Sequence, residues 1–181
     1  MFKKEIKNQI EPFIYEKIDN EIEVKDFSPL LTYNRFDLAF KLYYLESLIS
    51  SETVFSDTLY KEHIRAFSLG NYTEFGNKEK NSVDLFKSTF LELYNDIKEN
   101  GFNELKSIVP LATDGSIING AHRTTIAIYL NITIKSVFTG LKPEPYSYLY
   151  FFKRNVPKYI LDATAIKFIE YASNTFVAFI W

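Results

Sequence analysis

Glycine, histidine, arginine and threonine residues that could bind a charged ligand are concentrated between Asp114 and Leu130, where the sequence reads DGSIINGAHRTTIAIYL. Asp114-Gly115 between two apolar runs is typical of a β-hairpin turn, and the residues after Gly120 have the periodicity of a helix. The first backbone N–H groups of a helix have no partner within it, and the helix dipole favours negative charge there. We therefore predict an anion-binding site at the start of this helix.

Side chains in the first turn of the predicted helix could complete that site. Arg123 can form a forked contact with phosphate oxygens, and His122 adds a donor that can become charged near neutral pH. Thr124 and Thr125 add hydroxyl groups for a phosphate or its metal ion, and Gly120 lets a ligand approach the backbone. The alternative is that His122 and Arg123 only end the preceding strand and pair with acidic residues.

A second cluster with chemical potential surrounds the start of an earlier predicted helix. Asp37, Lys41 and Tyr44 follow one another at i, i+4 and i+7, so they share one helix face, and Arg35 lies just before them. We predict that Arg35, Asp37 and Lys41 recognise a substrate, the alternative being an ordinary salt bridge on a solvated face. His63, next to an acidic residue in a short helix, is expected at the surface.

Composition excludes several kinds of site. The chain has no cysteine and two histidines, which removes disulfides, thiolate zinc sites, a cysteine nucleophile and any multi-histidine metal site. Its 21 basic and 23 acidic residues give a net charge of −2, which disfavours a globally basic, DNA-binding protein. The N-terminus lacks a signal-peptide pattern, and no apolar run reaches the roughly 18–20 residues that span a bilayer, so we expect a cytoplasmic protein without a membrane span.

The elements that must position these residues follow from apolar periodicity and from turn residues. We predict helices over residues 32–50, 60–67, 84–99, 121–130 and 160–171, and strands over residues 22–24, 107–111, 116–118, 132–138 and 175–181. The aromatic run 146–152 is expected in the core and in an edge strand, the alternative being a surface that stacks on a base or a sugar. The fold class is α+β, a small mixed sheet flanked by helices, with a helical extension (residues 1–68) packed on a core (residues 69–181).

The order of these motifs resembles the ParB/sulfiredoxin-like superfamily over about residues 74–137. The features that match are a polar loop with Glu74 and Lys78, a helix that ends at Gly101, the strand Val109-Pro110-Leu111, and the turn Gly120-Ala121-His122-Arg123. In that superfamily this turn holds the phosphates of a nucleotide. The resemblance implies that Gly120, Ala121, His122, Arg123 and Thr124, with Lys78, bind a nucleotide.

Departures from the pattern decide among members of the superfamily. Sulfiredoxins carry a cysteine where this chain has Ala121, so their sulfinic-acid repair chemistry is excluded. Chromosome-partitioning members carry an arginine-rich turn and a helix-turn-helix region, and this chain has no such turn and no obvious basic recognition helix. The free-serine kinases are the most similar, with a G-x-H-R turn and an acidic residue for the acceptor hydroxyl.

The resemblance therefore implies an ATP- and Mg²⁺-dependent kinase acting on a small hydroxyl-bearing molecule. The acceptor could be an amino acid, an amino alcohol or a sugar, in the last case in surface-glycan biosynthesis. Glu74, His122 and Arg123 are the expected catalytic residues, Lys80 is an alternative phosphate ligand to Lys78, and Asp114 or Glu74 would hold Mg²⁺. The alternatives are a nucleotide-binding switch or DNA-associated module without kinase activity, a ParB-like nuclease, and a degenerate scaffold domain.

Overall fold

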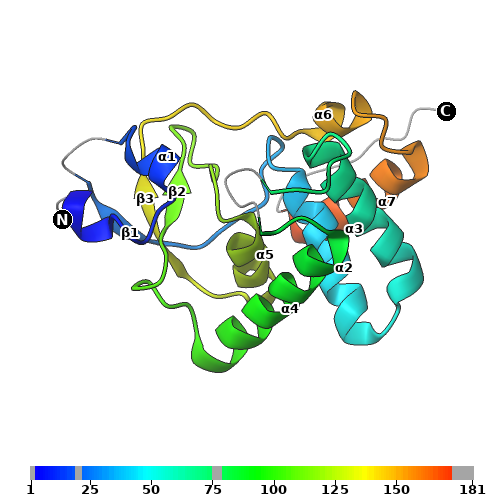
Figure 1. Cartoon of the computed structure of the whole chain (residues 1–181), viewed down its shortest axis with the longest axis horizontal. Coiled ribbons are helices and arrows are strands. Elements are labelled where there is room, and N and C mark those ends of the chain that lie inside the picture. Colours follow the sequence, from blue (N-terminus) through cyan, green and yellow to red (C-terminus); the bar gives the residue numbers. More distant parts are fainter. Residues whose placement is uncertain (1–2, 19–21, 75–78, 173–181) are drawn as a thin grey trace.

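Short runs of β-branched and aliphatic residues form a three-stranded sheet, in the order β1-β3-β2, in the computed structural model of the chain (Figure 1). The structure describes residues 3–18, 22–74 and 79–172. β1 (Val24–Phe27) pairs antiparallel with β3 (Ile134–Phe138), and β2 (Val109–Leu111) pairs parallel with β3. Parallel neighbours need a crossover connection, which here contains α5 (Ala121–Leu130). The β2–α5–β3 unit thus presents the start of α5 at one end of the sheet.

The segment between β2 and α5 turns sharply, as the Asp-Gly pair predicted. The Ala112 N–H donates to the Ser116 carbonyl at 2.8 Å, and Leu111 forms an antiparallel bridge with Ile117. The predicted second strand, residues 116–118, contributes this isolated bridge rather than a strand of the sheet. The turn nevertheless brings the chain back along β2 and into α5.

The helix α4 (Val83–Asn100) confirms the strongest helical prediction. The Ser82 hydroxyl accepts a hydrogen bond from the Leu85 N–H at 3.3 Å, and Gly101 ends the helix with a φ of +75°. Its buried face consists of Phe86, Phe90, Tyr94 and Ile97. This face packs on α5 and on residues of α2 and α3.

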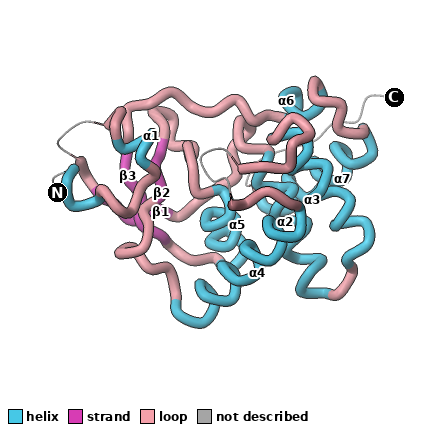
Figure 2. The backbone as a smooth tube through the Cα atoms, viewed as in Figure 1, coloured by secondary structure: helices cyan, strands magenta, loops and turns pink. Residues whose placement is uncertain are grey.

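The other helices are gathered on the right-hand side of Figure 1, away from the sheet. They are α2 (Asp37–Ser50), α3 (Thr53–Phe67), α6 (Tyr148–Phe152) and α7 (Lys158–Tyr171). α2 packs against α3, α5 and α7, and its apolar residues are at the centre of the largest core cluster. Figure 2 shows α4 and α5 between these helices and the sheet. No helix in the described ranges has the length and apolar character needed to cross a membrane.

The N-terminal segment is anchored on the sheet by isoleucines. It contains a 3₁₀ turn, Lys3–Ile6, and the short helix α1, Pro12–Tyr15. The buried residues of this cluster share a branched aliphatic side chain: Ile6, Ile10, Ile14, Ile18, Ile22, Ile108 and Val137. The N-terminal segment therefore has a regular apolar face on the sheet, and Glu11, in the same segment, pairs with Arg123 of α5.

Several predicted boundaries and elements are wrong. The first long helix begins at Asp37 rather than at residue 32, because the Arg35 N–H bonds to the Thr32 carbonyl in a turn and the Phe36 N–H bonds to the Tyr146 carbonyl. α3 begins at residue 53, seven residues before the prediction, and the aromatic run forms helix α6 rather than an edge strand. The predicted terminal strand, residues 175–181, lies outside the described residues.

The predicted α+β class is confirmed, with seven α-helices and one three-stranded sheet in the described residues. β1 belongs to the predicted extension (residues 1–68) and pairs with β3 of the predicted core (residues 69–181). Likewise, α2 of the extension packs on α5 and α7 of the core. The two predicted parts therefore share one sheet and one apolar interior.

Candidate functional site

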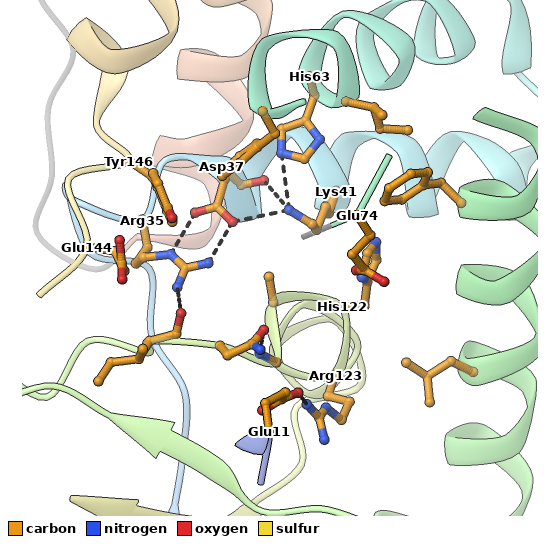
Figure 3. A pocket seen from close by; sticks show the side chains of 18 of the residues that line it. Glu11, Arg35, Asp37, Lys41, His63, Glu74, His122, Arg123, Glu144 and Tyr146 are labelled. Carbon is orange, nitrogen blue, oxygen red and sulfur yellow. Dashed lines mark hydrogen bonds and ion pairs between the residues drawn. The ribbon is translucent and has the colours of Figure 1, made fainter. Parts of the chain in front are cut away.

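A cavity of about 650 Å³ brings the two predicted clusters together (Figure 3). One wall is the start of α5, with Gly120, Ala121, His122 and Arg123, and the other wall is the start of α2 with Arg35, Asp37 and Lys41. Glu74, Glu11 and Tyr146 come from three further segments. A volume of this size is typical of small-molecule and cofactor sites. Four of the described candidates are not part of its lining: Lys80, Asp114, Thr124 and Thr125.

The turn before α5 owes its shape to Gly120. This residue has a φ of +83°, and its N–H donates to the Asn119 side-chain oxygen at 2.6 Å. A Cβ at Gly120 would lie 3.2 Å from Nη2 of Arg123, so the arginine folds back over a position that has no side chain. Glycine thus permits both the backbone conformation and the location of the guanidinium at the start of α5.

Arg123 pairs with a residue from the far end of the sequence. Its Nη2 donates to Oε1 of Glu11 at 3.3 Å, and the arginine side chain retains 17% of its exposure. The other carboxylate oxygen of Glu11 is buried and has no partner in the described part of the chain. Nothing in the local sequence around Glu11 indicated this role, because Glu11 and Arg123 are 112 positions apart in the chain.

His122 lies in a different environment from the one predicted. Its Nε2 is 2.8 Å from the Tyr60 hydroxyl, and its ring packs edge-on against Phe90. Burial, with the positive charges of Lys41 and Lys80, lowers the pKa of His122 well below its usual range. The expectation that His122 becomes charged near neutral pH is therefore corrected: the imidazole is neutral and acts as a hydrogen-bonding group.

The threonines that follow do not face the cavity. Thr125 donates its hydroxyl to the Ala121 carbonyl at 2.8 Å. Thr124 is fully buried, and its hydroxyl oxygen has no partner in the described ranges. The predicted ligand role of Thr124 would require a rearrangement of α5. Lys78, the other predicted ligand, lies outside the described residues.

Glu74 lies at the side of the cavity, between its two walls (Figure 3). Its Oε1 accepts from Nζ of Lys80 at 3.4 Å, and its N–H donates to the Lys80 carbonyl at 3.0 Å. Lys80 also lies over the Phe86 ring, 4.5 Å from the centroid. The loop thus brings the Glu74 carboxylate to the cavity, and Lys80, which does not line the cavity, holds Glu74 through main-chain and side-chain contacts.

Asp114 stabilises the turn in which it lies and does not line the cavity. Its Oδ1 accepts from the Ser116 N–H and hydroxyl, and its Oδ2 accepts from the Asn34 amide at 3.1 Å. The hydrogen bonds from Ser116 lower the pKa of the Asp114 carboxyl. The predicted metal ligand is therefore used to shape the hairpin. Within the described ranges, no three acidic or histidine side chains are grouped in a way that could hold a metal ion.

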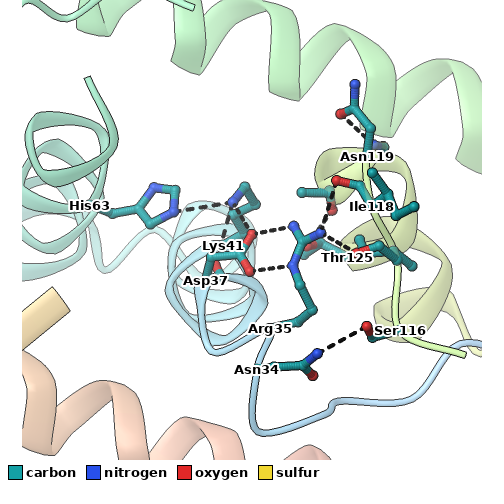
Figure 4. Close-up of polar contacts among 12 residues, drawn as sticks. Asn34, Arg35, Asp37, Lys41, His63, Ser116, Ile118, Asn119 and Thr125 are labelled. Carbon is teal, nitrogen blue, oxygen red and sulfur yellow. Dashed lines mark hydrogen bonds and ion pairs between the residues drawn. The ribbon is translucent and has the colours of Figure 1, made fainter. Parts of the chain in front are cut away.

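The opposite wall is a buried network of charged groups on α2 (Figure 4). Arg35 forms a bidentate pair with Asp37, both contacts at 2.8 Å, and its Nη1 donates to the Ile117 carbonyl at 2.6 Å. Nζ of Lys41 lies 3.1 Å from Oδ2 of Asp37 and 3.2 Å from Nε2 of His63. These four side chains are at most 5% exposed. The alternative of a salt bridge on a solvated face is therefore wrong, and so is the surface position expected for His63.

Burial and pairing set the charge states of this network. Burial alone would raise the pKa of the Asp37 carboxyl, but Arg35 and Lys41 hold it below its usual range. Burial lowers the pKa of Lys41 to about 8, against the opposing effect of Asp37. Burial, together with Lys41, lowers the pKa of His63 well below its usual range. At neutral pH, the network therefore contains two cations, one anion and a neutral imidazole.

The polar part of the cavity is completed by the segment before α6. Tyr146 lies beside Arg35, with the guanidinium carbon 5.2 Å from the ring centroid, and it hydrogen-bonds to Glu144. Both residues line the cavity. The predicted aromatic run therefore contributes one ring to the site, and most of its other rings pack in the core.

Comparison with family models, with curated proteins and with solved structures gives no match to this chain.

Proposed function

We propose that the protein is an ATP-dependent phosphotransferase that phosphorylates a hydroxyl group of a small molecule. The observation that carries this proposal is the convergence of the two predicted clusters. Gly120–Arg123 and Arg35–Lys41 are about 80 residues apart in sequence, yet they line opposite walls of one cavity. A transferase for two small substrates needs such facing subsites.

The α5 wall supports binding of the nucleotide phosphates. It combines the first N–H groups of a ten-residue helix with the guanidinium of Arg123. Tyr60 and His122 share a hydrogen bond nearby, which leaves one neutral donor between them. Phosphoryl transfer depends mainly on positioning and on neutralising charge, both of which these groups can supply.

Glu74 supports the chemical step, as the predicted carboxylate that lines the cavity. In the transfer, the acceptor oxygen bonds to the γ-phosphorus, the bond to the β–γ bridging oxygen breaks, and ADP leaves. A carboxylate is needed to take the hydroxyl proton or to hold Mg²⁺, which typically uses one or two carboxylates with phosphates and waters. Glu74 fits either role, whereas Asp114 is committed to its turn.

The test is formation of ADP from ATP and Mg²⁺ that depends on a hydroxyl acceptor, with a panel of amino acids, amino alcohols and sugars. Arg123→Gln should abolish turnover, and Glu74→Gln should lower kcat by about 10²-fold or more. Lys106→Gln and Glu92→Gln change exposed residues outside the cavity and should retain full activity.

One outcome would reject the kinase, and another would reject only its site. Thermal stabilisation by a nucleotide without acceptor-dependent ADP formation would favour the nucleotide-binding switch. Full activity of Arg123→Gln would reject the assignment of the α5 turn.

A further inference from the structure

The charges at the α2 end of the cavity do not balance. Arg35 and Lys41 are both cations, and Asp37 is the carboxylate that pairs with each of them. Among the described residues, no other carboxylate forms an ion pair with either cation. Burial of unpaired charge is costly, so a net charge of +1 at this depth indicates a site that awaits an anion.

The hydrogen bonds show which of the two cations, Arg35 or Lys41, has a donor left for an anion. Arg35 uses Nε and Nη2 on Asp37, and Nη1 on the Ile117 and Ile118 carbonyls. Its donors are therefore almost fully used. Lys41 has a carboxylate and an imidazole as close partners, and its third contact, with the Asp37 carbonyl, is 3.5 Å long. Lys41 is thus the cation with a hydrogen-bond donor to offer.

His63 supplies an independent sign of a missing partner. As the charged Lys41 donates to Nε2, the neutral imidazole carries its proton on Nδ1. That Nδ1 is buried and has no hydrogen-bond partner in the described part of the chain, although the histidine lines the cavity. A buried donor without an acceptor is rare in folded proteins, and a ligand oxygen would satisfy it.

We propose that Lys41 binds an anionic group of the phosphate acceptor, a carboxylate or a phosphate, that Nδ1–H of His63 donates to a separate oxygen of the same molecule, and that Arg35 and Asp37 are positioning residues. This inference rests on the proposed function and narrows it. The acceptor would carry a negative charge in addition to its hydroxyl group. Neutral sugars and neutral amino alcohols would then be poor substrates.

The experiment measures thermal stabilisation by acetate, by inorganic phosphate and by MgATP, at constant ionic strength. It compares the wild type, Lys41→Met, Arg123→Gln and the surface control Lys106→Met. Lys41→Met should lose at least half of the shift produced by acetate or phosphate and keep the shift produced by MgATP. Arg123→Gln should lose the MgATP shift and keep at least half of the anion shift. The anion that gives the larger Lys41-dependent shift identifies the group.

The design separates loss of binding from loss of fold. Lys41→Met leaves the Arg35–Asp37 pair balanced, so its melting temperature without ligand should equal or exceed that of the wild type. Three results for Lys41→Met would each overturn the inference. They are a melting temperature below that of the wild type, an anion shift as large as in the wild type, and the loss of the MgATP shift. If MgATP stabilises no protein, the wild type included, the proposed function fails, while the comparison between anions still tests Lys41.

Discussion

The two walls of the cavity hold their cations in opposite ways. On α2, Arg35 and Lys41 share Asp37 in a network with contacts of 2.8–3.1 Å, away from solvent. On α5, Arg123 has one contact of 3.3 Å with Glu11 and remains partly exposed. The difference indicates that the partners of the α2 cations are fixed before a ligand binds, whereas the partner of Arg123 can be exchanged. An anion can replace Glu11 on Arg123, but it can only add to the network around Lys41.

The largest expected effect is a loss of stability when the carboxylate shared by Arg35 and Lys41 is removed. Asp37→Asn leaves two buried cations without a counter-charge, which should cost about 3–5 kcal/mol of the free energy of unfolding. Asp57→Asn is the matched control, because Asp57 pairs with Lys87 at the surface and should contribute less than about 1 kcal/mol. Urea denaturation at pH 7 checks both, and equal costs would contradict a tightly coupled network.

The next largest effect is a pH dependence of stability that is caused by the titration of Lys41. Its folded pKa of about 8 lies below the usual 10.5, so between these values the unfolded chain binds a proton that the folded chain does not. Wild-type stability should therefore rise, relative to Lys41→Met, by up to about 3 kcal/mol as the pH increases from 8 to 10.5. The charged or titratable groups that act on Lys41 are Asp37, Arg35, His63 and Lys80.

Denaturation of both proteins at several pH values gives this difference directly, since other groups that titrate in this range are common to both. A difference that stays constant from pH 7 to pH 10.5 would show that burial does not disfavour the charged lysine.

A smaller effect distinguishes backbone strain from crowding at the α5 wall. Gly120→Ala and Gly140→Ala both place a side chain at positive φ, and each should cost about 1–2 kcal/mol. Only the Cβ at residue 120 meets Arg123, at 3.2 Å from Nη2, whereas nothing lies within 4 Å at residue 140. Gly120→Ala should therefore also weaken stabilisation by MgATP, and Gly140→Ala should not. Identical MgATP responses would contradict the packing of Arg123 over Gly120.

The smallest expected effect concerns the exchangeable pair itself. Glu11→Gln removes the carboxylate that competes with a phosphate for Arg123, so it should tighten nucleotide binding about two- to fivefold, as expected for a partly exposed ion pair. Glu16→Gln, an exposed neighbour, is the control. Calorimetric titration with MgATP measures both affinities. Weaker binding in Glu11→Gln would instead indicate that Glu11 helps to hold the ligand or its metal ion.

Local patterns predicted several elements well. The apolar periodicity of residues 84–99 and Gly101 predicted one helix, and Asp114-Gly115 predicted the turn before α5. These signals depend on residues within a few positions of one another, so a single sequence contains them. The start of α2 was misplaced because the turn at residues 32–36 is held by Tyr146, more than 100 residues away.

Residue types and spacing were enough to identify the groups of the candidate site: a helix start with a glycine and an arginine at Gly120–Arg123, a charged cluster at Arg35–Lys41, and a carboxylate at Glu74. The three-dimensional fold is needed to show that they line one cavity, that Glu11 pairs with Arg123, and that the buried His63 and the half-buried His122 are neutral. The physical reason is that residue type and spacing specify local conformation and chemistry. Charge state and pairing depend on burial and on neighbours that are distant in the chain.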